Sequence, residues 1–398
     1  MSTPTRAIEV LELAASEAFQ RALIVAAEHA HDVDRQGRFP TEAVAALRSA
    51  GALGWGIPLE YGGDGAGIDD LADAAFELSR RCSATGMIFA MHQIQVASIV
   101  RHMADSLWFR NYLKRVVREQ RLIASATSEV GVGGDMRKSI AAVTPAADSP
   151  DSLVQFEKKA STISYGAYAD DLLTTLRRTP DAESGDQVLV LTHFSEMDAK
   201  PMSTWDTLGM RGTCSPGFVV RATCLTDQVL PVPFASIAAE TVVPVSHILW
   251  ANVWLGISTD AFSRAQNFVR AQARQNPGTT PPTALRLSEL SSRMAEFRAL
   301  VHGATQEYMG LADSDRRAGL STIGYAVRIN NLKIAAAEAA AEACQGALRI
   351  CGFAGYGNAG PFSVGRQLRD AHSAALMIAN DRLLATNAAL LLVYREGK

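Results

Sequence analysis

The chain is 398 residues long, which is enough for two or three packed units rather than one small core. Apolar residues make up 48% of it and charged residues 20%, the balance of an ordinary globular protein. A formal net charge of −3 without a basic run argues against nucleic acid or an anionic membrane as a partner. The apolar runs are shorter than the ~18 residues of a membrane span, so we expect no membrane insertion.

The N-terminus and the cysteines indicate a compartment. Residues 1–6 lack the basic-then-apolar pattern of a signal peptide. Five cysteines, an odd number without a Cys-x-x-Cys pair, favour reduced thiols over a disulfide framework. The histidines and cysteines also show no spacing typical of a metal site. We therefore expect a cytoplasmic protein without a bound metal.

Residues 1–118 are predicted to form an N-terminal α-helical domain. Apolar residues recur at helical spacing over residues 7–31. Further helices are predicted from Thr41 to Gly51, over residues 70–80 and over residues 86–103.

Residues 119–245 show a different period and predict a middle antiparallel β-domain. Residues 187–192 and 218–222 are short segments rich in β-branched side chains, and residues 153–156 and 172–176 are weaker examples. Turn residues separate these segments, as expected for a small sheet.

Residues 246–398 return to helical spacing and predict a C-terminal four-helix bundle. The expected helices cover residues 247–275, 282–312, 325–351 and 366–393. The third contains an alanine-rich stretch whose apolar residues surround much of the helix. Either an oligomer interface or a deep core position explains this pattern. The predicted fold class is therefore α+β with three domains.

Four segments, in order along nearly the whole chain, resemble the acyl-CoA dehydrogenase family. The first is Pro-Leu-Glu-Tyr-Gly-Gly at 58–63, similar to the family's Pro-x-x-Tyr-Gly-Gly loop. The second is Ser-Glu-Val-Gly-Val-Gly-Gly-Asp at 128–135, which resembles the family's flavin loop. The third is the segment 159–170, followed by Leu-Gly-Met-Arg at 208–211. The fourth is the glycine-rich stretch 349–357, followed by Arg-Asp-Ala at 369–371.

The resemblance implies a bound flavin, with FAD as the expected form and FMN if the protein is a monooxygenase. Glycine in the second segment lets backbone amides approach a phosphate without a Cβ in the way. Gly134 stands where the family usually has serine, and Thr162 replaces the usual tryptophan. The expected cofactor residues are Ser128, Gly133, Gly134, Thr162, Ser164, Arg274, Arg349, Gly352 and Asn380. In the family the loop matched by 349–356 reaches the FAD of a neighbouring subunit, so the resemblance implies a dimer or tetramer.

The match fails at the catalytic base. The family's dehydrogenases remove the α-proton of an acyl thioester with a glutamate, and the usual position of that glutamate holds Ile378 here. A second position used by some members lies in residues 244–250, which contain no carboxylate. His247, where a pocket arginine is usual, and His92 are the candidate catalytic residues. Trp250 and Ile378 are expected to line the substrate pocket.

Three functions fit these observations. One is an FAD-dependent dehydrogenase that acts on a CoA thioester with a non-standard base and passes electrons to an electron-transfer flavoprotein. Another is a flavin monooxygenase that uses O2 and takes reduced flavin from a separate reductase. The third is a non-catalytic subunit that pairs with an active paralogue. The missing glutamate counts against the first, while Arg274 and the loop 352–357 favour a full FAD and place the dehydrogenase slightly ahead, with the monooxygenase and the non-catalytic subunit as alternatives.

Overall fold

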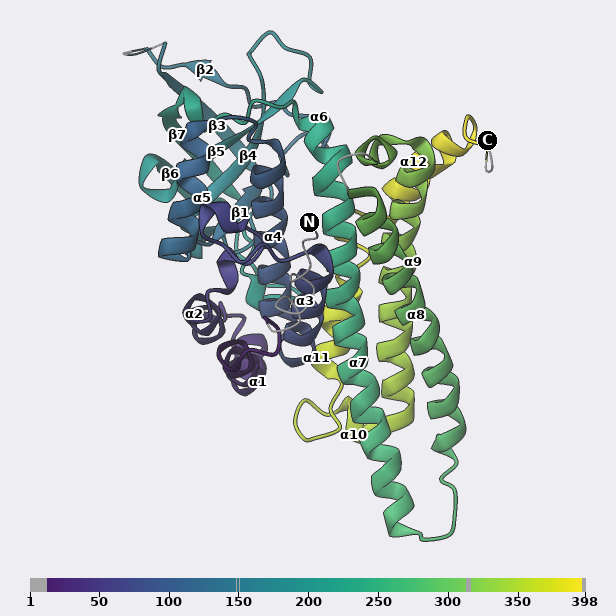
Figure 1. Ribbon diagram of the computed structural model, residues 1–398. Helices are drawn as coiled ribbons and strands as arrows, with labels where there is room; N and C mark the ends of the chain where they lie inside the picture. Colours follow the sequence, from purple (N-terminus) through teal and green to yellow (C-terminus); the bar gives the residue numbers. More distant parts are fainter. Residues whose placement is uncertain (1–12, 148, 150, 313–315, 396–398) are drawn as a thin grey trace, which may run out of the picture.

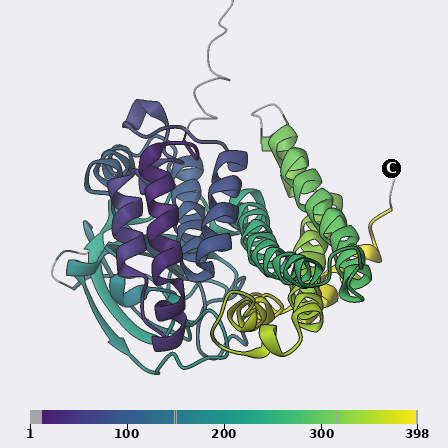
Figure 2. The same ribbon diagram turned by 90° about the horizontal axis from the view of Figure 1, so that it is seen from below.

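The computed structural model describes residues 13–147, 149, 151–312 and 316–395. Short helices, a pair of small sheets and a set of long helices form three parts that lie side by side (Figure 1). Seen from below, the N-terminal helices lie in front of the sheets, and the long helices stand to one side of both (Figure 2). The α+β fold class and the order of the three parts expected from the sequence are confirmed.

The N-terminal part contains five α-helices: α1 (Glu17–Gln36), α2 (Thr41–Ser49), α3 (Ile68–Arg81), α4 (Ser83–His102) and α5 (Leu107–Glu119). The Ser16 hydroxyl caps the N-terminus of α1 by accepting a hydrogen bond from the Phe19 amide. Gly37, whose φ is 62°, caps the C-terminus. Residues 7–12 of the first predicted helix lie outside the described residues. Helix α4 is buried on nearly every side, because it lies between the other helices, the sheet and the bundle.

The middle part contains seven strands: β1 (Ile123–Ala126), β2 (Thr144–Pro145), β3 (Leu153–Ala160), β4 (Asp171–Arg177), β5 (Gln187–His193), β6 (Met197–Pro201) and β7 (Phe218–Leu225). They form one sheet in the order β1-β4-β5 and another in the order β2-β3-β7-β6. All pairings between these strands are antiparallel except β1 with β4, which is parallel and corrects the purely antiparallel expectation. The long connection from 127 to 170 is the crossover that such a parallel pair requires.

A buried carboxylate joins the helical part to the sheet. Asp171 is fully buried at the start of β4 and accepts hydrogen bonds from Tyr112 on α5, Arg121 and His193 at 2.6–2.7 Å. Burial alone would raise the pKa of Asp171, but the hydrogen bonds from Arg121, His193 and Tyr112 hold the pKa below its usual value. The charged form is therefore stable in the interior and fixes α5 against the sheet.

The C-terminal part is built on the long helices α7 (Val243–Gln275), α8 (Thr283–Ala312) and α9 (Ile323–Cys351). Shorter elements precede and follow them: α6 (Phe234–Ile237), a π-helical turn η8 (Ala238–Val242), α10 (Phe353–Tyr356), α11 (Gly365–His372) and α12 (Asn380–Leu391). Pro244 follows the π-turn and cannot donate a backbone hydrogen bond, which suits an irregular junction at that point. The alanine-rich face of α9 packs against α7, α8, α11 and α12 of the same chain, so a deep core position accounts for it.

The predicted single helix over 366–393 is wrong, because the chain breaks between α11 and α12. Ile378 lies in this break with φ 50°, a conformation that is rare for a β-branched residue. The buried ammonium of Lys333 on α9 donates hydrogen bonds to the carbonyls of Ala374 and Ile378 and to Oδ1 of Asn380, at 2.7–2.9 Å. These contacts satisfy backbone acceptors that a continuous helix would otherwise have used.

Among the described residues, one helical segment is long and apolar enough to cross a membrane by length and composition, Phe234–Gln275. Within the protein, 67% of its most apolar 18-residue window is buried. Contacts of α7 with α3, α4 and α9 account for that burial, so the segment is a core helix of this fold.

Candidate functional site

A cavity of about 520 Å³ lies between the upper end of the bundle and the middle domain, within the usual size range of small-molecule sites. The segment from α6 to α7, the start of α9, the helix α12 and two loops of the middle domain enclose it. The lining residues are Gly134, Asp135, Met136, Arg137, Gly185, Gln187, Phe234, Ala235, Ala238, Ala239, Val243, His247, Leu320, Ser321, Tyr325, Ala326, Ile329, Asn330, Ile378, Arg382, Leu383, Thr386 and Leu390.

The cavity is mainly apolar, and its charged groups come from one edge. Asp135 and Arg137 follow the glycine-rich loop, and Arg382 projects from α12. Asp135 is the only carboxylate in the described lining, and it is paired with Arg137 at 3.4 Å. The cavity therefore offers no free carboxylate to act as a base.

His247 on α7 is a buried polar residue of the helical wall. Its side chain is 1% exposed, and Nδ1 lies 3.1 Å from the carbonyl oxygen of Ile329. A carbonyl can only accept, so Nδ1 carries the hydrogen and Nε2 keeps a lone pair. Burial lowers the pKa of His247 to about 4, and the nearby charge of Lys333 acts in the same direction. His247 is therefore a neutral ring, and its Nε2 is enclosed without a hydrogen-bond partner among the described residues.

Tyr325 supplies a second polar atom without a partner. Its ring is 2% exposed, lines the cavity, and its hydroxyl has no hydrogen bond within the described protein. Burial raises the pKa of Tyr325, so the phenol keeps its proton. The sequence interpretation missed this residue, although it starts the α9 turn that leads to Ile329, the partner of His247.

The two residues expected to line the pocket lie in different places. Ile378 lines the cavity. Trp250 is one turn from His247, with the ring centroids 6.1 Å apart, but it does not belong to the cavity wall. Its buried indole packs in the core beside the site.

His92 is not among the residues that line this cavity, and its ring has a structural environment. The ring is fully buried, Nε2 lies 2.8 Å from the carbonyl oxygen of Leu53, and Nδ1 accepts from the Ile123 amide at 3.1 Å. Both nitrogens are therefore occupied. His92 links α4 to β1 and offers no free atom to a substrate, so its position gives the predicted catalytic role no support.

Two of the expected cofactor positions face each other across the middle domain. The Ser128 hydroxyl donates to the carbonyl oxygen of Thr162 at 2.8 Å and accepts from the Thr162 amide at 3.1 Å. Ser164, two residues further, accepts from the Ser215 hydroxyl at 3.0 Å. These partly exposed hydroxyl groups form one polar edge of the domain.

The glycine-rich loop suits a phosphate-bearing ligand. Gly131, Gly133 and Gly134 all have positive φ, and a Cβ at Gly133 would meet nothing within 4 Å. Such successive left-handed residues leave backbone amides open to an anion. Arg382 donates to the carbonyl oxygen of Gly133 and so joins the loop to α12, two residues after Asn380. The residues present therefore fit a flavin at this edge, with a guanidinium beside it.

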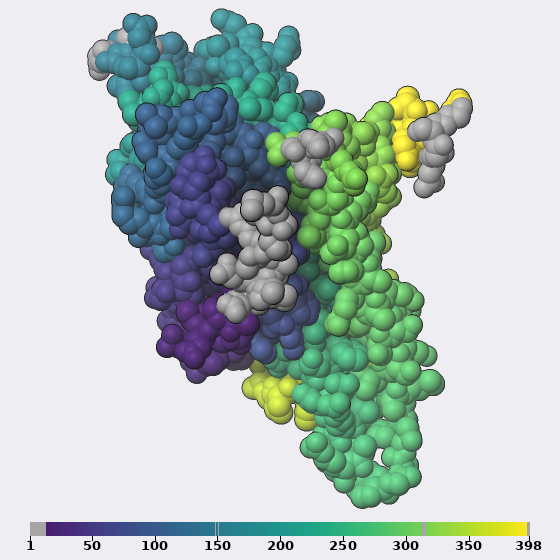
Figure 3. Space-filling model, viewed as in Figure 1, coloured from purple at the N-terminus to yellow at the C-terminus, as the bar shows by residue number. Residues whose placement is uncertain are grey.

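The remaining cofactor candidates are far away in the same chain. Arg274 is 27 residues after His247 along α7, a helical distance of about 40 Å at 1.5 Å per residue. Arg349 and Gly352 lie at the C-terminal end of α9. The tip of the α7–α8 hairpin projects beyond the rest of the molecule (Figure 3). One chain does not bring these residues to the Ser128 edge.

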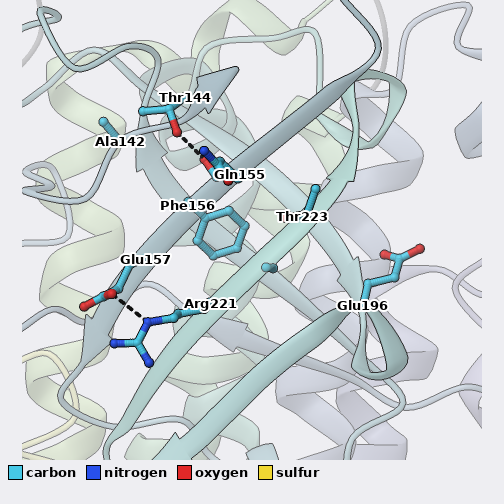
Figure 4. A pocket seen from close by; sticks show the side chains of 9 residues that line it. Ala142, Thr144, Gln155, Phe156, Glu157, Glu196, Arg221 and Thr223 are labelled. Carbon is cyan, nitrogen blue, oxygen red and sulfur yellow. Dashed lines mark hydrogen bonds and ion pairs between the residues drawn. The ribbon is translucent and has the colours of Figure 1, made fainter. Parts of the chain in front are cut away.

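A second hollow of about 470 Å³ lies on the sheet β2-β3-β7-β6, around Phe156 (Figure 4). Several of its polar side chains already have partners. Thr144 donates to the backbone of Gln155 at 3.0 Å, and Arg221 pairs with Glu157 across the strands at 2.7 Å. Because these groups are satisfied within the protein, this hollow makes a weaker case for a ligand than the cavity at His247.

Among the described residues, no group of three or more His, Cys, Asp or Glu side chains could hold a metal ion. Lys333 and Arg382, which act on the cavity wall and on the glycine loop, were not singled out from the sequence. Arg382 lies four residues after Ile378, and this spacing could have suggested it. Nothing in the apolar neighbourhood of Lys333 marks it as a hydrogen-bond donor to a distant segment.

Comparisons with known proteins show what this chain is similar to. Residues 13–120 match the model of the acyl-CoA dehydrogenase N-terminal domain. The chain is 23% identical over 355 residues to a 3-(aryl)acrylate reductase of Clostridium sporogenes, covering 87% of this chain and 89% of that protein. It is 25% identical over 354 residues to a short-chain-specific acyl-CoA dehydrogenase of Clostridium acetobutylicum, covering 86% of this chain and 87% of that protein.

The fold is also that of a solved monooxygenase. FMN-bound TdsC from Paenibacillus sp. A11-2, a dibenzothiophene monooxygenase, superposes with a TM-score of 0.79 at 21% identity, covering 94% of this chain and 98% of that one. Residues 13–120 therefore match the acyl-CoA dehydrogenase N-terminal domain, and the whole chain is similar in sequence and fold to acyl-CoA dehydrogenase-like proteins.

Proposed function

We propose that this protein is a flavin-dependent oxidoreductase, and that its cavity supports a monooxygenase reaction on a small apolar molecule rather than thioester dehydrogenation. One observation carries this proposal: the cavity has Ile378 at the position of the usual base, and its only buried titratable base, His247, has a pKa of about 4. A group this weakly basic is poorly matched to removing a carbon-bound proton near neutral pH.

The chain's own residues have definable roles in such a reaction. Ser128, Thr162 and the loop at Gly133 would hold the flavin, and Arg382 would fix that loop against α12. A bound reduced flavin would activate O2, and a separate reductase would provide that reduced flavin. The apolar walls of the cavity, which include the rings of His247 and Tyr325, would exclude water from the substrate.

Dehydrogenation is the second candidate, because a reductase and a dehydrogenase align over most of the chain. The test is to load the protein with flavin and add butyryl-CoA anaerobically while following the visible absorbance of the flavin. We expect no bleaching in the wild-type protein. Bleaching would favour dehydrogenation over the monooxygenase proposal. A protein that binds no flavin would support the third function, a non-catalytic subunit.

The variant Ile378→Glu sharpens this test. It restores a carboxylate at the position where the family's dehydrogenases carry one. Bleaching by butyryl-CoA in Ile378→Glu alone would show that the cavity admits a thioester but that the natural protein is not its dehydrogenase. Ile378→Gln, similar in size and uncharged, is the matched control and should remain inactive.

We further propose a homo-oligomer, a dimer or tetramer, in which Arg274 of one subunit reaches the FAD of another. Arg274→Ala should then weaken FAD binding while changing FMN binding little, since it removes a charge-assisted contact worth roughly 1.5–3 kcal/mol. Arg270, exposed and one turn earlier on α7, provides the matched control Arg270→Ala. Equal loss of FAD and FMN in titrations of apoprotein, or a flavin-loaded monomer in light scattering, would contradict the proposal.

A further inference from the structure

We propose that Glu129 is a positioning residue for the flavin: its buried carboxylate closes the glycine-rich loop 130–138 and fixes that loop in the conformation that binds the cofactor's phosphate. The inference rests on the proposed function for the placement of the flavin at this loop. It adds a residue that acts on the cofactor through the backbone of the loop.

Glu129 joins the two ends of the loop. Its side chain is buried, with 5% of the residue exposed. Oε1 accepts a hydrogen bond from the Ala141 amide at 2.7 Å, and Oε2 accepts from the Ser139 hydroxyl at 2.7 Å and from the Ile140 amide at 3.1 Å. Hydrogen bonds to a carboxylate are stronger than those between neutral groups. Glu129, which precedes the loop, is therefore firmly bonded to the three residues that follow it.

Lys158 on β3 supplies the opposite charge. It is fully buried, and its Nζ lies 3.5 Å from Oε2 of Glu129. The same ammonium donates to the carbonyl and the hydroxyl of Thr175 on β4, at 2.6 and 2.9 Å. Burial lowers the pKa of Lys158 to about 8, while Glu129 acts in the opposite direction, so the ammonium form predominates at neutral pH. The closed ends of the loop are thus anchored on two strands of the middle domain.

The loop requires such an anchor because of its glycines. Gly131, Gly133 and Gly134 have positive φ, and glycine loses more conformational freedom on ordering than any other residue. A ligand that meets an already ordered loop does not have to supply that ordering free energy on binding. Arg382 holds the loop from the bundle side at the Gly133 carbonyl, and Glu129 holds its ends from the sheet side. Because residues 134–137 line the cavity, this closure also fixes one wall of the cavity.

The test compares FMN with riboflavin, which differ only in the phosphate. Binding of each to the flavin-free full chain is measured by fluorescence quenching, in the wild-type protein and in Glu129→Gln. Glutamine is similar in size, but its NH2 group cannot accept the hydrogen bonds that one carboxylate oxygen accepts. We expect Glu129→Gln to bind FMN about tenfold or more weakly and to bind riboflavin within about twofold of the wild-type protein. A variant that merely disturbs the fold would weaken the binding of both flavins alike.

Two further variants keep the result interpretable. Glu157→Gln makes the same substitution at an exposed carboxylate on β3 that pairs with Arg221, and it should change neither affinity. Ser139→Ala removes one donor to Glu129 and is the milder change, should Glu129→Gln fail to fold. It should weaken FMN binding by about three- to tenfold and leave riboflavin binding unchanged.

Hydrogen exchange of the flavin-free proteins provides a measurement that needs no ligand. The amides of residues 131–135 should exchange faster in Glu129→Gln than in the wild-type protein, while the long helices of the bundle exchange at the same rate. Unchanged exchange in the loop would overturn the inference. Equal weakening of FMN and riboflavin, or unchanged FMN affinity in the folded variants, would overturn it as well.

These outcomes are separable from failure of the proposed function. A wild-type protein that binds neither FMN nor FAD would contradict the proposed function and this inference together. A wild-type protein that binds FMN no more tightly than riboflavin would contradict this inference alone, since the loop would then not bind the phosphate. Bleaching of the flavin by butyryl-CoA, together with selective loss of FMN in Glu129→Gln, would contradict the monooxygenase proposal and leave the role of Glu129 in place.

Discussion

Replacing Lys333 by methionine is expected to lower the free energy of unfolding by roughly 3–5 kcal/mol, the scale for removing one member of a buried charged network. The ammonium is fully buried, and its three hydrogens match three acceptors, the carbonyls of Ala374 and Ile378 and Oδ1 of Asn380. It also lies 5.7 Å from the centroid of the Trp254 ring. Methionine fills a similar volume but leaves all three acceptors unpaired.

Urea unfolding of the two proteins measures this difference. Lys114→Met is the matched control: Lys114 is exposed on α5, so its loss should change stability by no more than about 0.5 kcal/mol. Because Lys333 holds Ile378 and Asn380 in place, Lys333→Met should also weaken flavin binding under conditions where the protein is folded. We expect Lys333→Met to be at least ~3 kcal/mol less stable than the wild-type protein. A difference of only about 1 kcal/mol would show that other contacts hold the break between α11 and α12.

The repeating patterns of the sequence were sufficient for the main elements. Alternating β-branched residues located β3, β4, β5 and β7, and helical spacing located the long helices of the bundle. The short edge strands β1, β2 and β6 were missed, since they contain too few residues for a periodic signal. Helix α5 was also missed. The parallel pairing of β1 with β4 joins residues almost fifty positions apart, which no local pattern reports.

The break before α12 is a feature that local sequence signals do not predict. Residues 374–379 are Ala-Ala-Leu-Met-Ile-Ala, good helix formers or neutral ones without glycine or proline. Propensity therefore predicts an unbroken helix. The chain departs from that preference because Lys333, more than forty positions earlier, binds the freed carbonyls. Tertiary contacts outweigh propensity at this point.

The site was only partly predictable, because some of its properties also depend on residues that are distant in the sequence. Counting along the family pattern identified His247 and Ile378, and both line the cavity. The protonation and hydrogen-bonding state of His247 depends on Ile329, 82 positions away, and on the charge of Lys333. The free hydroxyl of Tyr325 depends likewise on the way α9 packs. Residue identity could be read from the sequence, whereas the polarity of the cavity required the fold.

The protein is expected to lose stability steeply as the pH falls from 6.5 to 5. Burial lowers the pKa of His92, His102 and His247 from the ordinary 6.5 to about 4. In this window the unfolded chain takes up three protons that the folded chain excludes, so stability rises with pH and falls on acidification. Each excluded proton costs about 1.4 kcal/mol for every pH unit below 6.5. Each histidine therefore contributes about 2 kcal/mol by pH 5, or roughly 6 kcal/mol for the three together.

That total is comparable with the whole stability of a typical domain, about 5–15 kcal/mol, so acid unfolding should begin above the usual carboxylate range. Urea midpoints measured between pH 7 and 5 follow the loss. His92→Gln is the informative variant, because an amide can still donate to the Leu53 carbonyl and accept from the Ile123 amide without titrating. It should remove about a third of the pH dependence. A wild-type stability that is flat over this range would mean that the three rings take up protons in the folded protein as readily as in the unfolded chain.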